Sequence, residues 1–229
     1  AIGDIASSIE LHDPAQAIGI ANRVLTSFTD RDLFMRAVLM RWVDADPKST
    51  AEYVLTLPAN GVRKELLQST LGAWAKTDPD AAIKFADVLP AGVERDWALC
   101  YVAYFWTGSD ATAAWNWATS LPAGETRVLS IQAVLRQLAT KSLNDAANLA
   151  VQLSGDEQVR AVRALITDSA VTNPTGTAAW VHDFPAGDAR DKAVEMLVKR
   201  WAERDPVAAS DWLLQEPQDK GFQDAAKQL

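Results

Sequence analysis

Cysteine and histidine are nearly missing from this chain, and their scarcity excludes several kinds of site. One cysteine among 229 residues excludes an intrachain disulfide, and two histidines leave too few soft ligands for a structural zinc ion. No run of about 18 apolar residues is present, and the first residues lack the basic segment and apolar core of a signal peptide. We therefore expect no metal, no cofactor and no membrane partner, while the compartment stays open.

Positive charge is also in short supply. The 22 Lys and Arg residues face 30 Asp and Glu residues, which gives a formal net charge of −8. A phosphate backbone would be repelled by this excess unless the cations were gathered on one face. The only regular cationic feature is one arginine per repeat, which is too dilute for such a face. We expect no binding of nucleic acid.

What the sequence has in abundance is repetition. The pair Leu57-Pro58 recurs at intervals of 31 or 32 residues. The later copies, some of them altered, are Leu89-Pro90, Leu121-Pro122, Leu153-Ser154, Phe184-Pro185 and Glu216-Pro217. A fixed period of this size indicates stacked supersecondary units, none of which can bury its apolar face alone.

Each unit carries the signals of a helix start eleven residues before that pair. The residues there are Asp46, Asp78, Asp110, Ser142, Asn173 and Asp205, and proline follows four of them. Such side chains cap a helix by accepting a hydrogen bond from a free backbone N–H. Proline suits the first helical position, where its missing N–H costs nothing. The pattern predicts a first helix running from the cap to the leucine-proline pair.

A second helix is expected after a short turn, which is clearest at Ala91-Gly92 and Ala123-Gly124. An arginine opens it in every unit: Arg31, Arg63, Arg95, Arg127, Arg160 and Arg190. Helix-end carbonyls and carboxylates lie near these positions in the sequence. We therefore predict that this arginine series is structural, hydrogen-bonded or ion-paired. The alternative is that it binds an acidic partner.

Large apolar residues recur at one position in each helix of the unit. The second helix carries Trp42, Trp74, Trp106, Leu138, Val171 and Trp201 near its end. The first helix carries Tyr53, Phe85, Trp117, Leu149, Trp180 and Trp212. A large residue that recurs at one position fills the same space in successive units, and its burial stabilises by about 1.5 to 3 kcal/mol. We predict that both series belong to the core.

The best copy of the repeat comprises Trp74, Asp78-Pro79, Ala81-Ala82, Leu89-Pro90, Gly92 and Arg95. It resembles tetratricopeptide-like helical hairpins, and more closely bacterial arrays with this order of Trp, Asp-Pro, Ala-Ala, Leu-Pro, Gly and Arg. The period differs from the 34 residues of tetratricopeptide repeats. The Leu-Gly and Tyr of their first helix are also out of register here, so their peptide-clamp residues are not carried over. The resemblance implies an all-α, right-handed α-solenoid of about six antiparallel hairpins with a non-catalytic interaction surface.

We predict one solenoid domain over residues 1–229. Its units cover approximately 13–45, 46–77, 78–109, 110–141, 142–172 and 173–204, with a partial unit at 205–229. Residues 1–12 and 221–229 look like pieces of helices from further units. We therefore expect the chain to be an excerpt of a longer array or a larger protein.

The third unit departs from the repeat by gathering aromatic residues at positions where several other units carry polar ones. These residues are Trp97, Tyr101, Tyr104 and Phe105, and Trp115 adds an aromatic at a position that otherwise holds Gly, Ala, Ser or Ile. Exposed aromatics dominate binding energy when a partner covers them. One interpretation is therefore a patch that binds a protein or peptide. The other is local repacking, in which Trp97 and Trp115 fill space beside small residues such as Gly72 and Ala133.

No catalytic arrangement is recognisable in the sequence. His182 and Asp183 are adjacent and would point apart on a helix, and no Ser or Cys nucleophile motif accompanies them. We predict a scaffold that binds protein or peptide and is not an enzyme. Two alternatives stay open: a helical accessory domain of a larger enzyme, for example one acting on polysaccharide or cell wall, and a closed α/α toroid enzyme, for which the chain is short.

Overall fold

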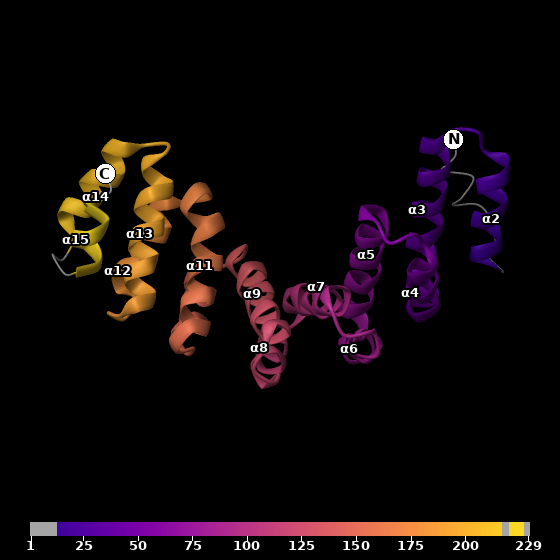
Figure 1. Cartoon of the computed structure of the whole chain (residues 1–229), viewed down its shortest axis with the longest axis horizontal. Coiled ribbons are helices and arrows are strands. Elements are labelled where there is room, and N and C mark those ends of the chain that lie inside the picture. The colour runs from indigo at the N-terminus through magenta and orange to yellow at the C-terminus, as the bar shows by residue number, and fades with distance from the viewer. Residues whose placement is uncertain (1–12, 217–219, 227–229) are drawn as a thin grey trace. The chain divides into compact units, whose positions relative to one another are not determined.

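The computed structural model describes residues 13–216 and 220–226, and every regular element in these two ranges is an α-helix. From α2 to α14, short helices of 9 to 11 residues alternate with long ones of 15 to 18 residues (Figure 1). The short ones, called A helices, are α2 (Pro14–Val24), α4 (Pro47–Thr56), α6 (Pro79–Asp87), α8 (Ala111–Ser120), α10 (Leu143–Val151), α12 (Pro174–Asp183) and α14 (Pro206–Gln215). The B helices that follow them are α3 (Phe28–Ala45), α5 (Gly61–Thr77), α7 (Val93–Ser109), α9 (Glu125–Ala139), α11 (Gly155–Thr172), α13 (Asp188–Ala202) and α15 (Lys220–Ala226). The all-α class is confirmed.

The predicted helix starts are confirmed residue by residue. Each of the six predicted caps accepts a hydrogen bond from the backbone N–H three positions later: Asp46, Asp78, Asp110, Ser142, Asn173 and Asp205. Asp13 caps α2 in the same way, with Pro14 at the first helical position. A cap of this kind stabilises a helix by about 1 kcal/mol. The A helices are short, so these caps fix where each one begins.

The helices form two compact units, which divide between Ser109 and Asp110. In the first unit the B helices α3, α5 and α7 pack side by side, and in the second unit α9, α11, α13 and α15 do so. An A helix contacts mainly B helices of its unit; α4, for example, packs against both α3 and α5. Each unit therefore has a layer of B helices with A helices on one side of it. The single domain expected over residues 1–229 stays a prediction.

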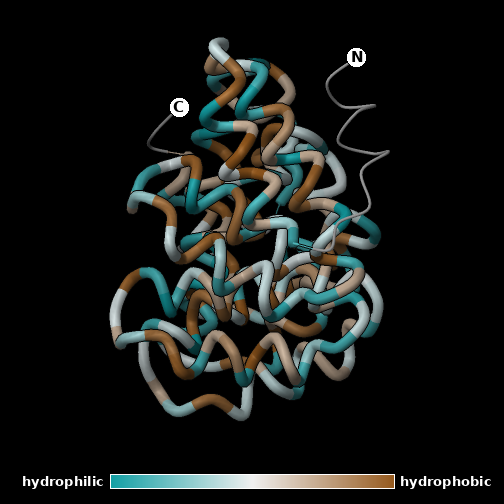
Figure 2. The backbone as a smooth tube through the Cα atoms, turned by 90° about the vertical axis from the view of Figure 1, so that its right-hand side faces the viewer, coloured by the Kyte–Doolittle hydropathy of each residue, from teal (hydrophilic) through white to brown (hydrophobic). Residues whose placement is uncertain are grey.

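Small residues in the A helices allow this close packing. Ala51, Ala82 and Ala114 are completely buried, where larger side chains would push the helices apart. The B helices bury a stripe of larger apolar residues, such as Val38 and Leu71. Brown hydrophobic and teal hydrophilic stretches accordingly alternate along the coiled tube (Figure 2).

The two series of large apolar residues meet where a B helix leads into the next A helix. The rings of Trp42 and Tyr53 lie 5.5 Å apart between centroids, as do those of Trp74 and Phe85. The Trp201–Trp212 pair has the same arrangement at 6.1 Å. Such pairs add about 0.5 to 1.5 kcal/mol to the gain from burial. Trp74, Trp180 and Trp201 are buried as predicted, whereas Trp42, Trp106, Trp117 and Trp212 are half-buried.

The opposite side of the B layer is exposed and carries side chains of several kinds. Leu33, Met40 and Trp97 lie on it in the first unit, and Arg136 and Lys199 in the second. Among the described helices, none is both long and apolar enough to cross a bilayer. The outward face of the B helices therefore offers exposed apolar and charged side chains to a partner.

Candidate binding surface

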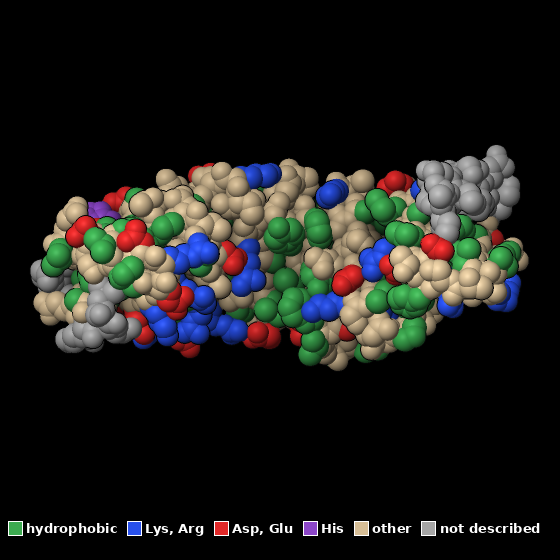
Figure 3. All heavy atoms as spheres, turned by 90° about the horizontal axis from the view of Figure 1, so that it is seen from above, with side chains coloured by type: hydrophobic (Ala, Val, Ile, Leu, Met, Phe, Trp, Pro, Cys, Tyr) green, Lys and Arg blue, Asp and Glu red, His purple; other side chains and the backbone are tan. Residues whose placement is uncertain are grey.

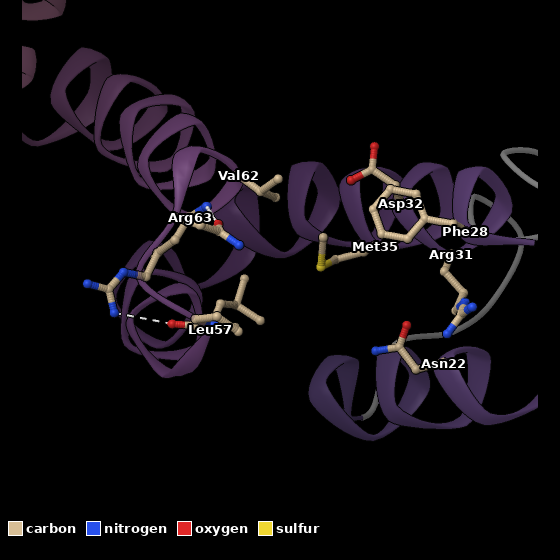
Figure 4. A pocket seen from close by; sticks show the side chains of 10 residues that line it. Asn22, Phe28, Arg31, Asp32, Met35, Leu57, Val62 and Arg63 are labelled. Carbon is tan, nitrogen blue, oxygen red and sulfur yellow. Dashed lines mark hydrogen bonds between the residues drawn. The ribbon is translucent and has the colours of Figure 1, made fainter.

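Two members of the arginine series, Arg63 and Arg127, hold the ends of A helices. Arg63 donates hydrogen bonds to the carbonyl oxygens of Leu55 and Leu57, and Figure 4 shows the contact with Leu57. Arg127 donates to the carbonyls of Thr119 and Leu121 in the same way. The last carbonyls of a helix have no partner within the helix, so these contacts satisfy them.

The same two arginines also reach the next B helix. Arg63 lies 2.8 Å from a carboxylate oxygen of Glu94, and Arg127 lies 2.7 Å from one of Glu157. Hydrogen bonding to Glu157 raises the pKa of the Arg127 guanidinium. At these positions each arginine therefore braces one hairpin against its successor. The predicted structural role of the arginine series is confirmed here.

In the fifth repeat unit, residues 142–172, the arginine position predicted from the sequence is wrong. We predicted Arg160 as its member of the arginine series, but Gln158 donates the corresponding bonds to the carbonyls of Ala150, Val151 and Leu153. The turn before α11 is short, and Gly155 begins the helix with a left-handed φ of 56°. Arg160 lies two residues further on, is exposed, and pairs instead with Glu125 at 3.0 Å.

A groove between α5 and α7 contains part of the predicted aromatic patch. It has a volume of about 310 Å³, and Leu67, Trp97 and Tyr101 are among its lining residues. Trp97 is 36% exposed, and the Nζ atom of Lys64 lies 3.9 Å from the centroid of its ring. A cation over an indole face is attracted to its π electrons by about 0.5 to 1 kcal/mol at an exposed site. We call this feature the Trp97 groove.

Tyr101 supports Trp97 from one helical turn away. Their ring centroids lie 5.9 Å apart, and Tyr101 is half-buried. Removal from water raises the pKa of the Tyr101 hydroxyl. The Trp97 side chain thus contacts a half-buried ring and a cation while part of it stays open to solvent.

Tyr104 and Phe105 form a second aromatic pair on α7, with centroids 5.2 Å apart in an edge-to-face arrangement. Both are half-buried. A Cβ atom placed on Gly72 would lie 2.6 Å from the Phe105 ring, so the ring occupies the space that this glycine leaves. The repacking interpretation therefore fits Phe105 at Gly72, whereas Trp97 lines an open groove.

Trp115 is only 7% exposed, on the same side of α8 as the fully buried Ala114 and Ala118. A side chain with so little exposed area offers little surface to a partner. Its place beside two buried alanines of the A helix is the sequence signal that favours the core. The proposed surface therefore rests on the residues of α5 and α7, and the binding role predicted for Trp115 stays a prediction.

A second groove lies between α3 and α5, with a volume of about 420 Å³. Figure 4 shows Phe28, Arg31 and Met35 around it on one side and Val62 and Arg63 on the other. Phe28 is 75% exposed and is not among the binding residues predicted from the sequence. The signal was available, because the residue three positions before the arginine is Asn60, Gly92 or Gly124 in the following units.

The described residues contain few arrangements suited to catalysis. They include no cluster of three or more His, Cys, Asp and Glu side chains that could hold a metal ion. The Nδ1 atom of His182 lies 2.5 Å from a carboxylate oxygen of Glu216, which links the end of α12 to the end of α14. That hydrogen bond raises the pKa of His182. We assign this pair a structural role, because it joins the ends of two A helices and its carboxylate is buried.

Comparison of the chain with protein-family models, with curated proteins and with solved structures finds no match. The side chains of the B-helix face are therefore the basis for assigning a function.

Proposed function

We propose that this chain is a non-catalytic scaffold module that binds a protein or peptide. In this proposal the helical hairpins form an open, right-handed α-solenoid of tetratricopeptide-like type. The alternation of A and B helices supports it, because a hairpin in such an array buries its apolar face only against its neighbours. An array of this kind offers a long continuous surface to a partner.

The observation that carries the proposal is the partly exposed indole of Trp97 at the edge of a groove. The groove is lined by the apolar side chains of Leu67 and Ala98 and by Lys64, while Arg63 in its lining is paired with Glu94. Tryptophan is among the residues on which interfaces most depend. The site is suited to an apolar or aromatic side chain of a partner, with a carboxylate of that partner near Lys64.

The test begins with peptides selected from a random twelve-residue library on the full chain. Binding of the selected peptides is then measured by fluorescence anisotropy with wild type and Trp97→Ala. We expect Trp97→Ala to weaken binding about 30-fold, as truncation of a central anchor does. The matched control is Leu214→Ala, which removes an apolar side chain that is 79% exposed on α14. It should leave binding unchanged.

Thermal melting followed by circular dichroism separates binding from folding. Because Trp97 is partly exposed, we expect Trp97→Ala to lower the melting temperature by only a few degrees, corresponding to about 1 kcal/mol. A loss of cooperative melting would make Trp97 a core residue and remove it from the site. Equal affinity of wild type and Trp97→Ala for every selected peptide would overturn the proposal for this groove.

A further inference from the structure

In the second of the two compact units, Asp110–Leu229, positive and negative side chains are distributed differently over the A and B helices. The A helices of that unit, α8, α10, α12 and α14, contain no Lys or Arg, and α10, α12 and α14 contain the carboxylates Asp145, Asp183 and Asp211. All the described Lys and Arg residues of the unit lie on B helices or in turns. Lys and Arg side chains gather visibly over the C-terminal half of the chain in Figure 3.

The corrected register shows how these cations line up. With Gln158 in the place of the arginine, Arg160 and Lys192 occupy one column of the repeat, two residues later. Arg163 falls five residues after Gln158, in the outward column that Gln132 occupies on α9. We define the basic face by six exposed residues: Arg136 on α9, Arg160 and Arg163 on α11, and Lys192, Lys199 and Arg200 on α13. The sequence alone predicts no such face, because its apparent register places Arg160 two positions too early in the repeat.

Half of these cations lack an ionic partner among the described residues. Arg136 lies 3.9 Å from Asp168, Arg160 3.0 Å from Glu125, and Lys192 2.7 Å from Glu195. No carboxylate of the described part of the chain pairs with the other three: Arg163, Lys199 and Arg200. Hydrogen bonding to Glu195 raises the pKa of Lys192, and the nearby positive charge of Arg163 opposes this. The face therefore holds neighbouring positive charges that its own carboxylates leave uncompensated.

We propose that the basic face binds an acidic segment of a partner protein. Lys192 and Lys199 are seven residues apart on α13, which separates them by about 10 Å along the helix axis. Carboxylates three residues apart in an extended peptide span about the same distance. Arg163 on the neighbouring helix gives the segment a contact beside α13.

The composition of the face favours protein over nucleic acid. Glu195 and Asp168 interrupt the cations and would repel a continuous phosphate backbone, whereas a protein partner can place its own cations there. Within the described outward face of α9, α11 and α13, no aromatic side chain is available for base stacking. A mixed-charge partner segment with a net negative charge fits both observations.

The probe is a fluorescein-labelled twelve-residue peptide that repeats Glu-Ser-Gly, with a Gln-Ser-Gly peptide as its uncharged match. Anisotropy is measured with the full chain at about 50 mM and about 300 mM salt. We expect the Glu peptide alone to bind, and to bind more weakly at the higher salt concentration. The triple variant Arg163→Ala, Lys199→Ala, Arg200→Ala should weaken binding about tenfold.

Two control variants define the site. Arg23→Ala, Lys48→Ala, Lys84→Ala removes the same number of positive charges from A helices of the first unit and should change the affinity less than twofold. Trp97→Ala should leave it unchanged, so failure of the Trp97 groove and failure of the basic face are distinguishable. Three outcomes overturn the proposal: equal losses in the two triple variants, no binding at the lower salt concentration, or tighter binding of a twelve-nucleotide oligothymidine than of the Glu peptide.

Discussion

The ring of Phe105 lies against the backbone of Gly72, with no room for a methyl group between them. Glycine inside a helix costs about 1 kcal/mol relative to alanine, so at this position a local penalty accompanies the contact between α5 and α7. We expect Gly72→Ala to destabilise the chain by about 1 to 3 kcal/mol through overpacking, despite the better helix propensity of alanine. Urea denaturation followed by circular dichroism measures the change.

Gly19 on α2 provides the matched control for that substitution. It is also a helical glycine, but a Cβ atom placed there would meet no heavy atom within 4 Å. Gly19→Ala should therefore stabilise by up to about 1 kcal/mol. The double variant Gly72→Ala, Phe105→Ala should lose less than the sum of its two single changes. Stabilisation by Gly72→Ala alone would mean that the Phe105 ring moves aside without cost.

The brace formed by Arg127 provides a second prediction. Arg127→Ala leaves Glu157 without its guanidinium partner and removes the donors to two carbonyls at the end of α8. Both side chains of the ion pair are mostly buried, with exposures of 20% and 24%. We expect a loss of about 2 kcal/mol in the free energy of unfolding. Arg136→Ala should cost less than about 0.5 kcal/mol, because its ion pair with Asp168 is long and exposed.

A third prediction tests the register of the fifth unit. Gln158→Ala removes three hydrogen bonds from one side-chain amide to the end of α10 and should cost about 1 kcal/mol. Arg160→Ala breaks only an exposed ion pair, so it should cost about half as much or less. Paired denaturation curves of the two variants decide the question. A larger loss for Arg160→Ala would restore the register that the sequence suggested.

The His182–Glu216 pair predicts a dependence of stability on pH. Glu216 raises the pKa of His182 by hydrogen bonding and by charge, so protonated His182 stabilises the folded state. This stabilisation is fully present below the unfolded pKa of about 6.5 and is lost as the pH rises through the higher folded value. His182→Gln should reduce the change in melting temperature between about pH 6 and 8. NMR titration in a His12→Gln background, which leaves one imidazole, should give a pKa above 6.5.

The regular parts of the fold were predictable because their signals are local. A cap residue and a proline determine a helix start through contacts within four residues, and the structure bears out all six predicted caps. The fifth turn was not predictable in the same way. Glutamine and arginine both end in donors that reach the same carbonyls, so Gln158 replaces the arginine function without preserving the residue type.

Exposure was harder to predict than position for the aromatic residues. Trp97 and Trp115 both break the repeat, yet the first lines an open groove and the second is buried. The difference depends on which side of its helix each tryptophan occupies relative to neighbouring helices, which one repeat unit alone does not reveal. The contact of Lys64 with Trp97 was not predictable for the same reason, because it joins two neighbouring hairpins.

The arginine braces also determine by what lengths this chain can be shortened or extended. The partners are 31 residues apart in Arg63–Glu94 and 30 apart in Arg127–Glu157, close to one hairpin. The carboxylate position of the brace holds Glu94 and Glu157, whereas the intervening and following hairpins hold Thr126 and Ala189 there. Removing or duplicating two complete hairpins therefore keeps a glutamate opposite a brace arginine, and a change of one hairpin does not. An excision that stops partway along a hairpin instead leaves a guanidinium facing the wrong residue and a helix end without its donor. The length change that preserves these braces is therefore a pair of hairpins.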